Sequence, residues 1–204
     1  MDWTYFDTII KKDVVVAGID EAGRGPLFGP VVAAAVILPY GLEIEGLNDS
    51  KKISEKKREK LFDIIKEKAI DYSIAQCSPR EIDELNILGA TMLAMKKAYK
   101  GLKVKPEMLL IDGNRATGFD LPVKTVIKGD ALVPSISAAS ILAKVTRDRY
   151  CIEMDKVYPE YQIAVHKGYP TKLHREKVIS LGPTPEHRLS FLKNLDKWKS
   201  EKDV

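Results

Sequence analysis

Residues 14–38 read VVVAGIDEAGRGPLFGPVVAAAVIL, and they predict the centre of the sheet. Its two ends, residues 14–19 and 31–38, are apolar and rich in β-branched residues, as strands are. Between them lie three glycines and two prolines, which suit a loop with unusual backbone angles rather than a helix. We therefore predict two antiparallel strands joined by a glycine-rich loop, with the first strand ending at Asp20.

Downstream, the apolar pattern predicts further strands and helices. The predicted helices cover residues 54–68, 79–99, 132–154, 171–181 and 187–199, and the predicted strands cover residues 69–76, 108–111 and 123–127. The second helix is marked by Ser78-Pro79-Arg80-Glu81, a capping box with proline at the first helical position. This order predicts an α/β fold with a mixed sheet flanked by helices and a small C-terminal helical subdomain.

Acidic residues follow three of the predicted strands, namely Asp20, Asp112 and Asp130. In open α/β sheets the carboxyl ends of neighbouring strands form ligand sites, so these side chains can converge. Adjacent residues of a regular strand point to opposite faces. We therefore expect the chain to turn after Asp20 and bring Glu21 back to the same site, with Gly23 and Gly25 allowing the turn.

Several ionised carboxylates in one cleft repel each other by about 1 to 4 kcal/mol per pair at about 4 Å, so a cation must offset them. Oxygen ligands without a histidine or cysteine cluster favour hard ions, with Mg²⁺ first and Mn²⁺ second. Such ions can activate water for phosphodiester cleavage. Singly, each acid also has a plain explanation, as a turn residue, a helix cap or a solvated loop acid. Their combination at strand ends favours the metal site.

Composition limits the class of protein. A chain of 204 residues suits one main domain rather than two. No segment has the long uncharged apolar run of a membrane span, and the acidic N-terminus does not resemble a signal peptide, so we expect a cytoplasmic protein. Cys77 and Cys151 are too few for a disulfide framework and lack zinc-site spacing. The net charge of +4 is compatible with almost any partner.

The motifs together resemble the type 2 ribonucleases H, specifically ribonuclease HII. The first motif is GIDEAGRGP at residues 18–26, followed by FGPVV at residues 28–32. The others follow in the order of the family over most of the chain: LNDSKK at 47–52, IDGN at 111–114, KGD at 128–130, SAASILAKV at 137–145 and HKGYPT at 166–171. The GRG triplet and the early first strand resemble type HII rather than type HIII.

This resemblance implies a single ribonuclease H-like catalytic domain over residues 1–204, with residues 155–204 as a helical C-terminal extension. It implies hydrolysis of the RNA strand of RNA/DNA hybrids and incision 5′ of single ribonucleotides embedded in duplex DNA. The products would carry 3′-hydroxyl and 5′-phosphate ends. The resemblance also implies that Asp20, Glu21, Asp112 and Asp130 hold Mg²⁺ or Mn²⁺ and are the catalytic residues.

The same resemblance assigns substrate contacts. Gly23, Arg24 and Gly25 would contact the ribonucleotide and the scissile phosphate, because a glycine-rich backbone can approach a ribose closely enough to bond its 2′-hydroxyl. Tyr169 would stack on the deoxyribose that follows, although it can instead be a packed aromatic. The other predicted substrate contacts are Asn48, Ser50, Lys51 and Lys52, of which the two lysines can also belong to a solvated face.

The predicted partner is therefore nucleic acid, bound by a monomer that does not associate with a membrane. The tail departs from the usual ending of the family at residues 192–194. It shows no convincing sliding-clamp motif, so clamp recruitment is left open.

Three other functions are open to test. A dinucleotide-binding protein would also carry glycines after a strand, but Pro26 and the late Gly29 break that fingerprint. A binding module without catalysis would use the basic stretches, although such runs are usually solvated helix faces. A DNA-only nuclease of the same fold would cut all-DNA duplexes equally well.

Two polar sets have ordinary explanations. His166, His174 and His187 fit no zinc spacing, and at most one of them would assist substrate binding. The serines at positions 135, 137 and 140 are predicted to let a helix pack closely, because no activating base lies beside them in the sequence.

Overall fold

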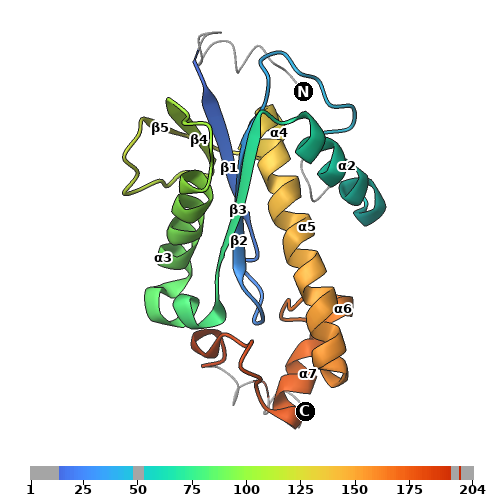
Figure 1. Cartoon of the computed structure of the whole chain (residues 1–204). Helices are drawn as coiled ribbons and strands as arrows, with labels where there is room; N and C mark the ends of the chain where they lie inside the picture. The colour runs from blue at the N-terminus through green and yellow to red at the C-terminus, as the bar shows by residue number, and fades with distance from the viewer. Residues whose placement is uncertain (1–13, 48–52, 194–197, 199–204) are drawn as a thin grey trace.

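The structure, a computed structural model, describes residues 14–47, 53–193 and 198 (Figure 1). It contains a five-stranded sheet in the order β3-β2-β1-β4-β5. The strands are β1 Val16–Ala22, β2 Val31–Ile37, β3 Asp71–Cys77, β4 Met108–Asp112 and β5 Val123–Val126. Neighbours among β1, β2 and β3 are antiparallel, whereas β4 runs parallel to both β1 and β5.

Helices cover both faces of this sheet, with α3 on one side and α5 on the other (Figure 1). The helices are α2 Glu55–Lys68, α3 Pro79–Lys100, α4 Gly129–Leu132, α5 Pro134–Val157, α6 Ile163–His166 and α7 Lys172–Leu181, with 3-10 turns η2 Pro159–Tyr161 and η3 Leu189–Phe191. The short C-terminal elements gather near the end of α5. The predicted mixed sheet flanked by helices is confirmed.

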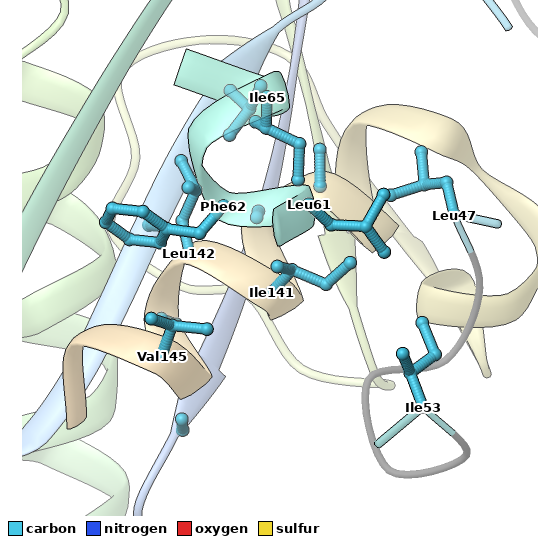
Figure 2. Close-up of a cluster of buried hydrophobic side chains, with 14 of the residues drawn as sticks. Leu47, Ile53, Leu61, Phe62, Ile65, Ile141, Leu142 and Val145 are labelled. Carbon is cyan, nitrogen blue, oxygen red and sulfur yellow. The ribbon is translucent and has the colours of Figure 1, made fainter. Parts of the chain in front are cut away.

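The hydrophobic core lies on both sides of β2. This strand is buried along its whole length, which explains why it is apolar at every position and not only at alternate ones. On the α5 side, Figure 2 shows a cluster that joins α5 to α2 and the loop before it. Its labelled members are Leu47, Ile53, Leu61, Phe62, Ile65, Ile141, Leu142 and Val145. The core thereby fixes α5 against the two central strands.

Gly18 lies where β1 meets the start of α5. A Cβ atom at this position would lie 2.3 Å from the carbonyl carbon of Ser135 and 2.4 Å from the amide nitrogen of Ile136. Both are backbone atoms, which cannot rotate away as a side chain can. Glycine at position 18 therefore allows α5 to begin in direct contact with β1. This contact lies two residues before Asp20.

The predicted end of the first strand is wrong. β1 continues past Asp20, because β2 keeps pairing with it, Glu21 opposite Ala33 and Ala22 opposite Val32. The glycine-rich turn therefore begins only at Gly23, whose φ of +96° is accessible to glycine at little cost.

The predicted helix over residues 187–199 is also wrong for residues 187–193. His187 forms an isolated bridge with Phe28, and the Arg188 N–H donates to the Leu27 carbonyl at 2.8 Å. Up to residue 193, only the 3-10 turn η3 follows. Contacts with the β1–β2 loop thus replace the hydrogen bonds of a helix.

Among the described residues, no helix is long and apolar enough to cross a membrane.

Candidate active site

Three of the four predicted acidic residues line one pocket of about 230 Å³. They are Asp20 and Glu21 of β1 and Asp112 at the end of β4. The pocket is also lined by Ala22, Gly23, Arg24, Gly25, Ser140, Lys144 and Tyr169. The structure therefore brings the acids of two neighbouring strands together with the glycine-rich turn.

The open edge of β1 explains how successive residues reach one pocket. Pairing between β1 and β4 ends at Ile19 and Ile111, so beyond that point no strand covers this edge. Asp20 bonds to Ser140 of α5 on one face of the sheet. Glu21 also lines a second pocket, against α3, with Leu88, Thr91, Met92 and Met95. The two acids thus belong to opposite faces, as strand alternation requires, and meet around the edge.

The electrostatics of this pocket disfavour charge on the acids. Burial raises the pKa of Asp20 well above its ordinary value, and the neighbouring Glu21 and Asp112 raise it further. Burial also raises the pKa of Glu21, although Arg24 opposes this shift from a distance of 3.3 Å. The side chain of Arg24 is 54% exposed, so solvent screens much of its charge. The pocket therefore holds more acidic groups than its nearby cation can balance.

Asp130 is placed differently. It lies in α4 and is buried, but it is not among the residues that line the pocket. The preceding residue, Gly129, donates its N–H to Asp112 Oδ1 at 2.7 Å. Within the described residues, no three acidic, histidine or cysteine side chains already converge as the ligands of one ion would. The start of α4 is thus tied to Asp112, while the Asp130 side chain stands outside the pocket.

The glycine-rich turn and Tyr169 form another part of the wall of this pocket. A Cβ at Gly25 would lie 3.7 Å from the Tyr169 ring, and the Leu27 N–H donates to the Gly168 carbonyl at 2.8 Å. The Tyr169 side chain is 42% exposed, with the Arg147 guanidinium 5.9 Å from its ring centre. An exposed aromatic ring beside a glycine turn can accept a flat or sugar-like group. The predicted contacts Asn48, Ser50, Lys51 and Lys52 lie outside the described residues.

Sequence reasoning missed two pocket residues, Ser140 and Lys144. Ser140 was predicted to serve helix packing, yet its hydrogen bond to Asp20 favours the charged carboxylate. The Lys144 ammonium donates to Asp148 Oδ1 at 2.7 Å. Both residues lie one helical turn apart in an otherwise buried stretch of α5. That spacing of polar residues on one helix face is the signal that could have found them.

The three histidines lie together next to the Tyr169 segment, with His187 and His174 joined by a hydrogen bond and His166 stacked on His174. The Thr184 N–H donates to His187 Nδ1 at 2.9 Å, so the neutral His187 ring carries its proton on Nε2. That Nε2 lies 3.1 Å from His174 Nε2, and His174 Nδ1 lies 3.0 Å from the Tyr169 carbonyl. The His166 ring stacks on His174 with centroids 4.2 Å apart. One set of neutral tautomers satisfies every contact of His174 and His187.

Acid should therefore destabilise the fold through these histidines. Burial lowers the pKa of His174 to about 4 and that of His187 to about 3. Since unfolded histidine titrates near about 6.5, the unfolded chain binds more protons below that pH. We expect the free energy of unfolding to fall as the pH drops from about 6.5 towards 3, and less steeply in His187→Gln. Urea titrations at several pH values measure this; identical pH slopes in the two proteins would refute it.

Comparisons with known proteins match the chain to one family. A family model described as ribonuclease HII matches residues 17–194. The chain is 30% identical to the ribonuclease H2 of Pyrococcus horikoshii OT3, with a TM-score of 0.74, 91% of this chain covered and 97% of that one. It is 27% identical to the ribonuclease HII of Archaeoglobus fulgidus, solved as a complex with PCNA, with a TM-score of 0.70 and coverage of 86% and 94%.

A more distant likeness concerns the fold alone. Bst-RNase HIII, solved in complex with Mn²⁺, is 17% identical, with a TM-score of 0.67. The alignment covers 92% of this chain and 70% of that one.

Proposed function

The chain belongs to the ribonuclease HII family and is a ribonuclease H. We propose that it also incises 5′ of single ribonucleotides in duplex DNA. The proposed products carry 3′-hydroxyl and 5′-phosphate ends. One observation carries the proposal: the acidic cluster and the turn Gly23-Arg24-Gly25 line the same pocket. Cleavage of the phosphodiester and recognition of the ribose would then take place in the same pocket.

The donor set suits a hard divalent cation. The pocket offers only carboxylate oxygens as strong ligands, and the exposed Arg24 balances their charge only in part. We propose Asp20, Glu21 and Asp112 as ligands of Mg²⁺ or Mn²⁺, with Asp130 joining them next to the Gly129 contact. The Mn²⁺ complex of Bst-RNase HIII supports this choice. When bound, the ion would polarise the scissile phosphate and lower the pKa of an attacking water.

The residues around the ion would select the substrate. Backbone N–H groups of the turn Gly23-Arg24-Gly25 can approach the ribose, whose 2′-hydroxyl distinguishes RNA from DNA. Tyr169 would stack on the following deoxyribose, while the charged side chains of Arg24 and Lys144, which line the pocket, would contact the phosphates. Asn48, Ser50, Lys51 and Lys52 remain proposed phosphate contacts by family resemblance. PCNA, the partner of the Archaeoglobus fulgidus relative, is a candidate partner here as well.

The direct test is a cleavage assay with Mg²⁺ or Mn²⁺ on three labelled duplexes: DNA with one ribonucleotide, an RNA/DNA hybrid, and all DNA. We expect cleavage of the first two with ends that a DNA ligase and a polymerase can use, and none of the third. Equal cutting of the all-DNA duplex would favour a DNA nuclease. Binding without cleavage would favour a non-catalytic module.

The Tyr169→Ala variant tests the proposed contact between Tyr169 and the substrate in the same assay. Full burial of a large apolar side chain is worth about 1.5–3 kcal/mol, so we expect loss of the ring's contact with the deoxyribose to lower cleavage at a single ribonucleotide about tenfold, with Tyr169→Phe close to the parent. Tyr40, which is 46% exposed and does not line the pocket, supplies the matched control Tyr40→Ala. Unchanged cleavage in Tyr169→Ala would remove Tyr169 from the proposed contacts.

A further inference from the structure

Arg188 lies fully buried behind the glycine-rich turn, although it comes from the C-terminal segment. Its guanidinium donates to the carbonyl oxygens of Gly23 at 2.6 Å, Pro26 at 2.7 Å and Arg24 at 3.1 Å. Its Nε donates to the Gly29 carbonyl at 2.9 Å. All four acceptors belong to the loop between β1 and β2. One side chain therefore fixes the orientation of four peptide groups in that loop.

Arg188 makes these bonds without a carboxylate partner. None of the ion pairs in the described part of the chain includes it. Burial lowers its pKa to about 9, and the charge of Arg147 adds to this effect. At neutral pH the guanidinium is still charged, so the dipoles of the loop carbonyls are what stabilise it. This charge in turn holds those carbonyls towards Arg188.

The carbonyls bound by Arg188 also fix the direction of the N–H groups on the same peptides. The C=O and N–H of one trans peptide point in opposite directions, and the described residues contain no cis peptide. With the carbonyls of Gly23 and Arg24 turned towards Arg188, the N–H groups of Arg24 and Gly25 point away from it. Neither N–H has a hydrogen-bond acceptor among the described residues. Both residues line the pocket of Asp20 and Glu21, so a substrate in that pocket can reach two donors that have no acceptor within the described part of the chain.

The C-terminal segment around Arg188 is itself anchored at both ends. The Gly29 N–H donates to the Glu186 carbonyl at 2.8 Å, so the segment is paired to the loop before Arg188. After Arg188, the N–H groups of Leu189 and Ser190 both donate to the Asp83 carboxylate at 2.9 Å. Asp83 lies in α3, which packs against the sheet. Arg188 is therefore held between a core helix and the turn.

We infer that Arg188 is a positioning residue for the reaction: it aims the N–H groups of Arg24 and Gly25 at the ribonucleotide as a fixed pair of donors. The inference deepens the proposed function and rests on it. Arg188 does not touch the substrate. It sets the orientation of the backbone that binds the 2′-hydroxyl and the adjacent phosphate, and its hydrogen bonds to the Gly23 and Arg24 carbonyls polarise the N–H groups of the same peptides.

The test compares Arg188→Lys with the parent. Lysine keeps the charge, but its single nitrogen cannot reach four carbonyls in the fork arrangement of a guanidinium. We expect the folded variant to cut a duplex with one ribonucleotide about tenfold or more slowly in kcat/KM. The thermal stabilisation by Mn²⁺ should stay as in the parent, because Arg188 lies outside the acidic cluster. The matched control is Arg149→Lys, which alters an exposed arginine paired with Glu59.

A second measurement uses the parent alone and does not depend on the folding of a variant. In EDTA, titration with the same ribonucleotide duplex should shift the amide resonances of Arg24 and Gly25 more than titration with an all-DNA duplex. Parent cleavage rates in folded Arg188→Lys, or equal amide shifts with both duplexes, would each overturn the inference. Failure of the parent to cut the ribonucleotide duplex would instead refute the proposed function, so the two failures are distinct.

Discussion

Asp20→Asn is expected to abolish most of the cleavage activity and to leave the metal-free fold as stable as the parent, or more stable. Loss of an outer partner of a metal ligand typically costs about 10–100-fold, so loss of a proposed ligand should cost more than about 100-fold. Stability should not fall, because burial and the neighbouring acids raise the pKa of Asp20. The ionised Asp20 side chain therefore lowers the free energy of unfolding above that pKa, and the neutral asparagine avoids this loss.

The measurement is cleavage of the ribonucleotide duplex together with thermal melting in EDTA and in Mn²⁺. The parent should gain stability from Mn²⁺, and Asp20→Asn should gain much less. Asp63→Asn, an exposed change on α2, is the matched control and should behave as the parent in all three measurements. A variant that cuts at the parent rate would show that Asp20 is not a ligand. A variant that melts far below the parent would mean that Asp20 stabilises the fold.

Gly18→Ala should have the largest effect on stability. The added methyl group would have to occupy space 2.3 Å from a backbone atom of Ser135 and 2.4 Å from one of Ile136. Relief requires that α5 move away from β1, which would also disturb the core between them. Overpacking of a core usually costs about 1–3 kcal/mol, and because here the contacts are backbone we expect about 3 kcal/mol or more.

Urea unfolding followed by circular dichroism gives this free energy. Gly89→Ala, within α3, is the control because its new Cβ would lie 3.3 Å from the Leu85 Cβ, a close contact that a shift of a few tenths of an ångström in one side chain relieves. Alanine also favours a helix over glycine by about 1 kcal/mol, so the control should change stability little. If Gly18→Ala unfolds at the same urea concentration as the parent, the close approach of α5 and β1 is not rigid.

The sequence allowed the sheet and most of its helices to be predicted because burial leaves a local periodic signal. β2 is apolar throughout, and the capping box at Ser78 and Glu81 forms as predicted. The grouping of Asp20 with Asp112 followed from strand ends. By contrast, the extent of β1 depends on pairing with β2, and periodicity within a single strand cannot reveal that pairing.

The C-terminal segment shows where local reasoning fails. Residues 187–193 are amphipathic enough to suggest a helix, yet contacts with a loop more than 150 residues earlier decide their conformation. The same applies to Arg188, which in the sequence is one more basic residue of the tail. Its four acceptors are identified only by the fold.

The distance in sequence between Arg188 and its loop affects the time at which the enzyme becomes active during synthesis. Arg188 follows Gly29 by 159 residues. A ribosome that adds about 5–20 residues per second needs about 8–32 seconds to bridge that interval. Throughout that time the turn Gly23-Arg24-Gly25 already exists in the nascent chain but lacks the guanidinium that orders it. A nuclease built this way acquires its specificity for the sugar only after Arg188 has been translated, so chains that terminate before Arg188 should be poor at incising ribonucleotides.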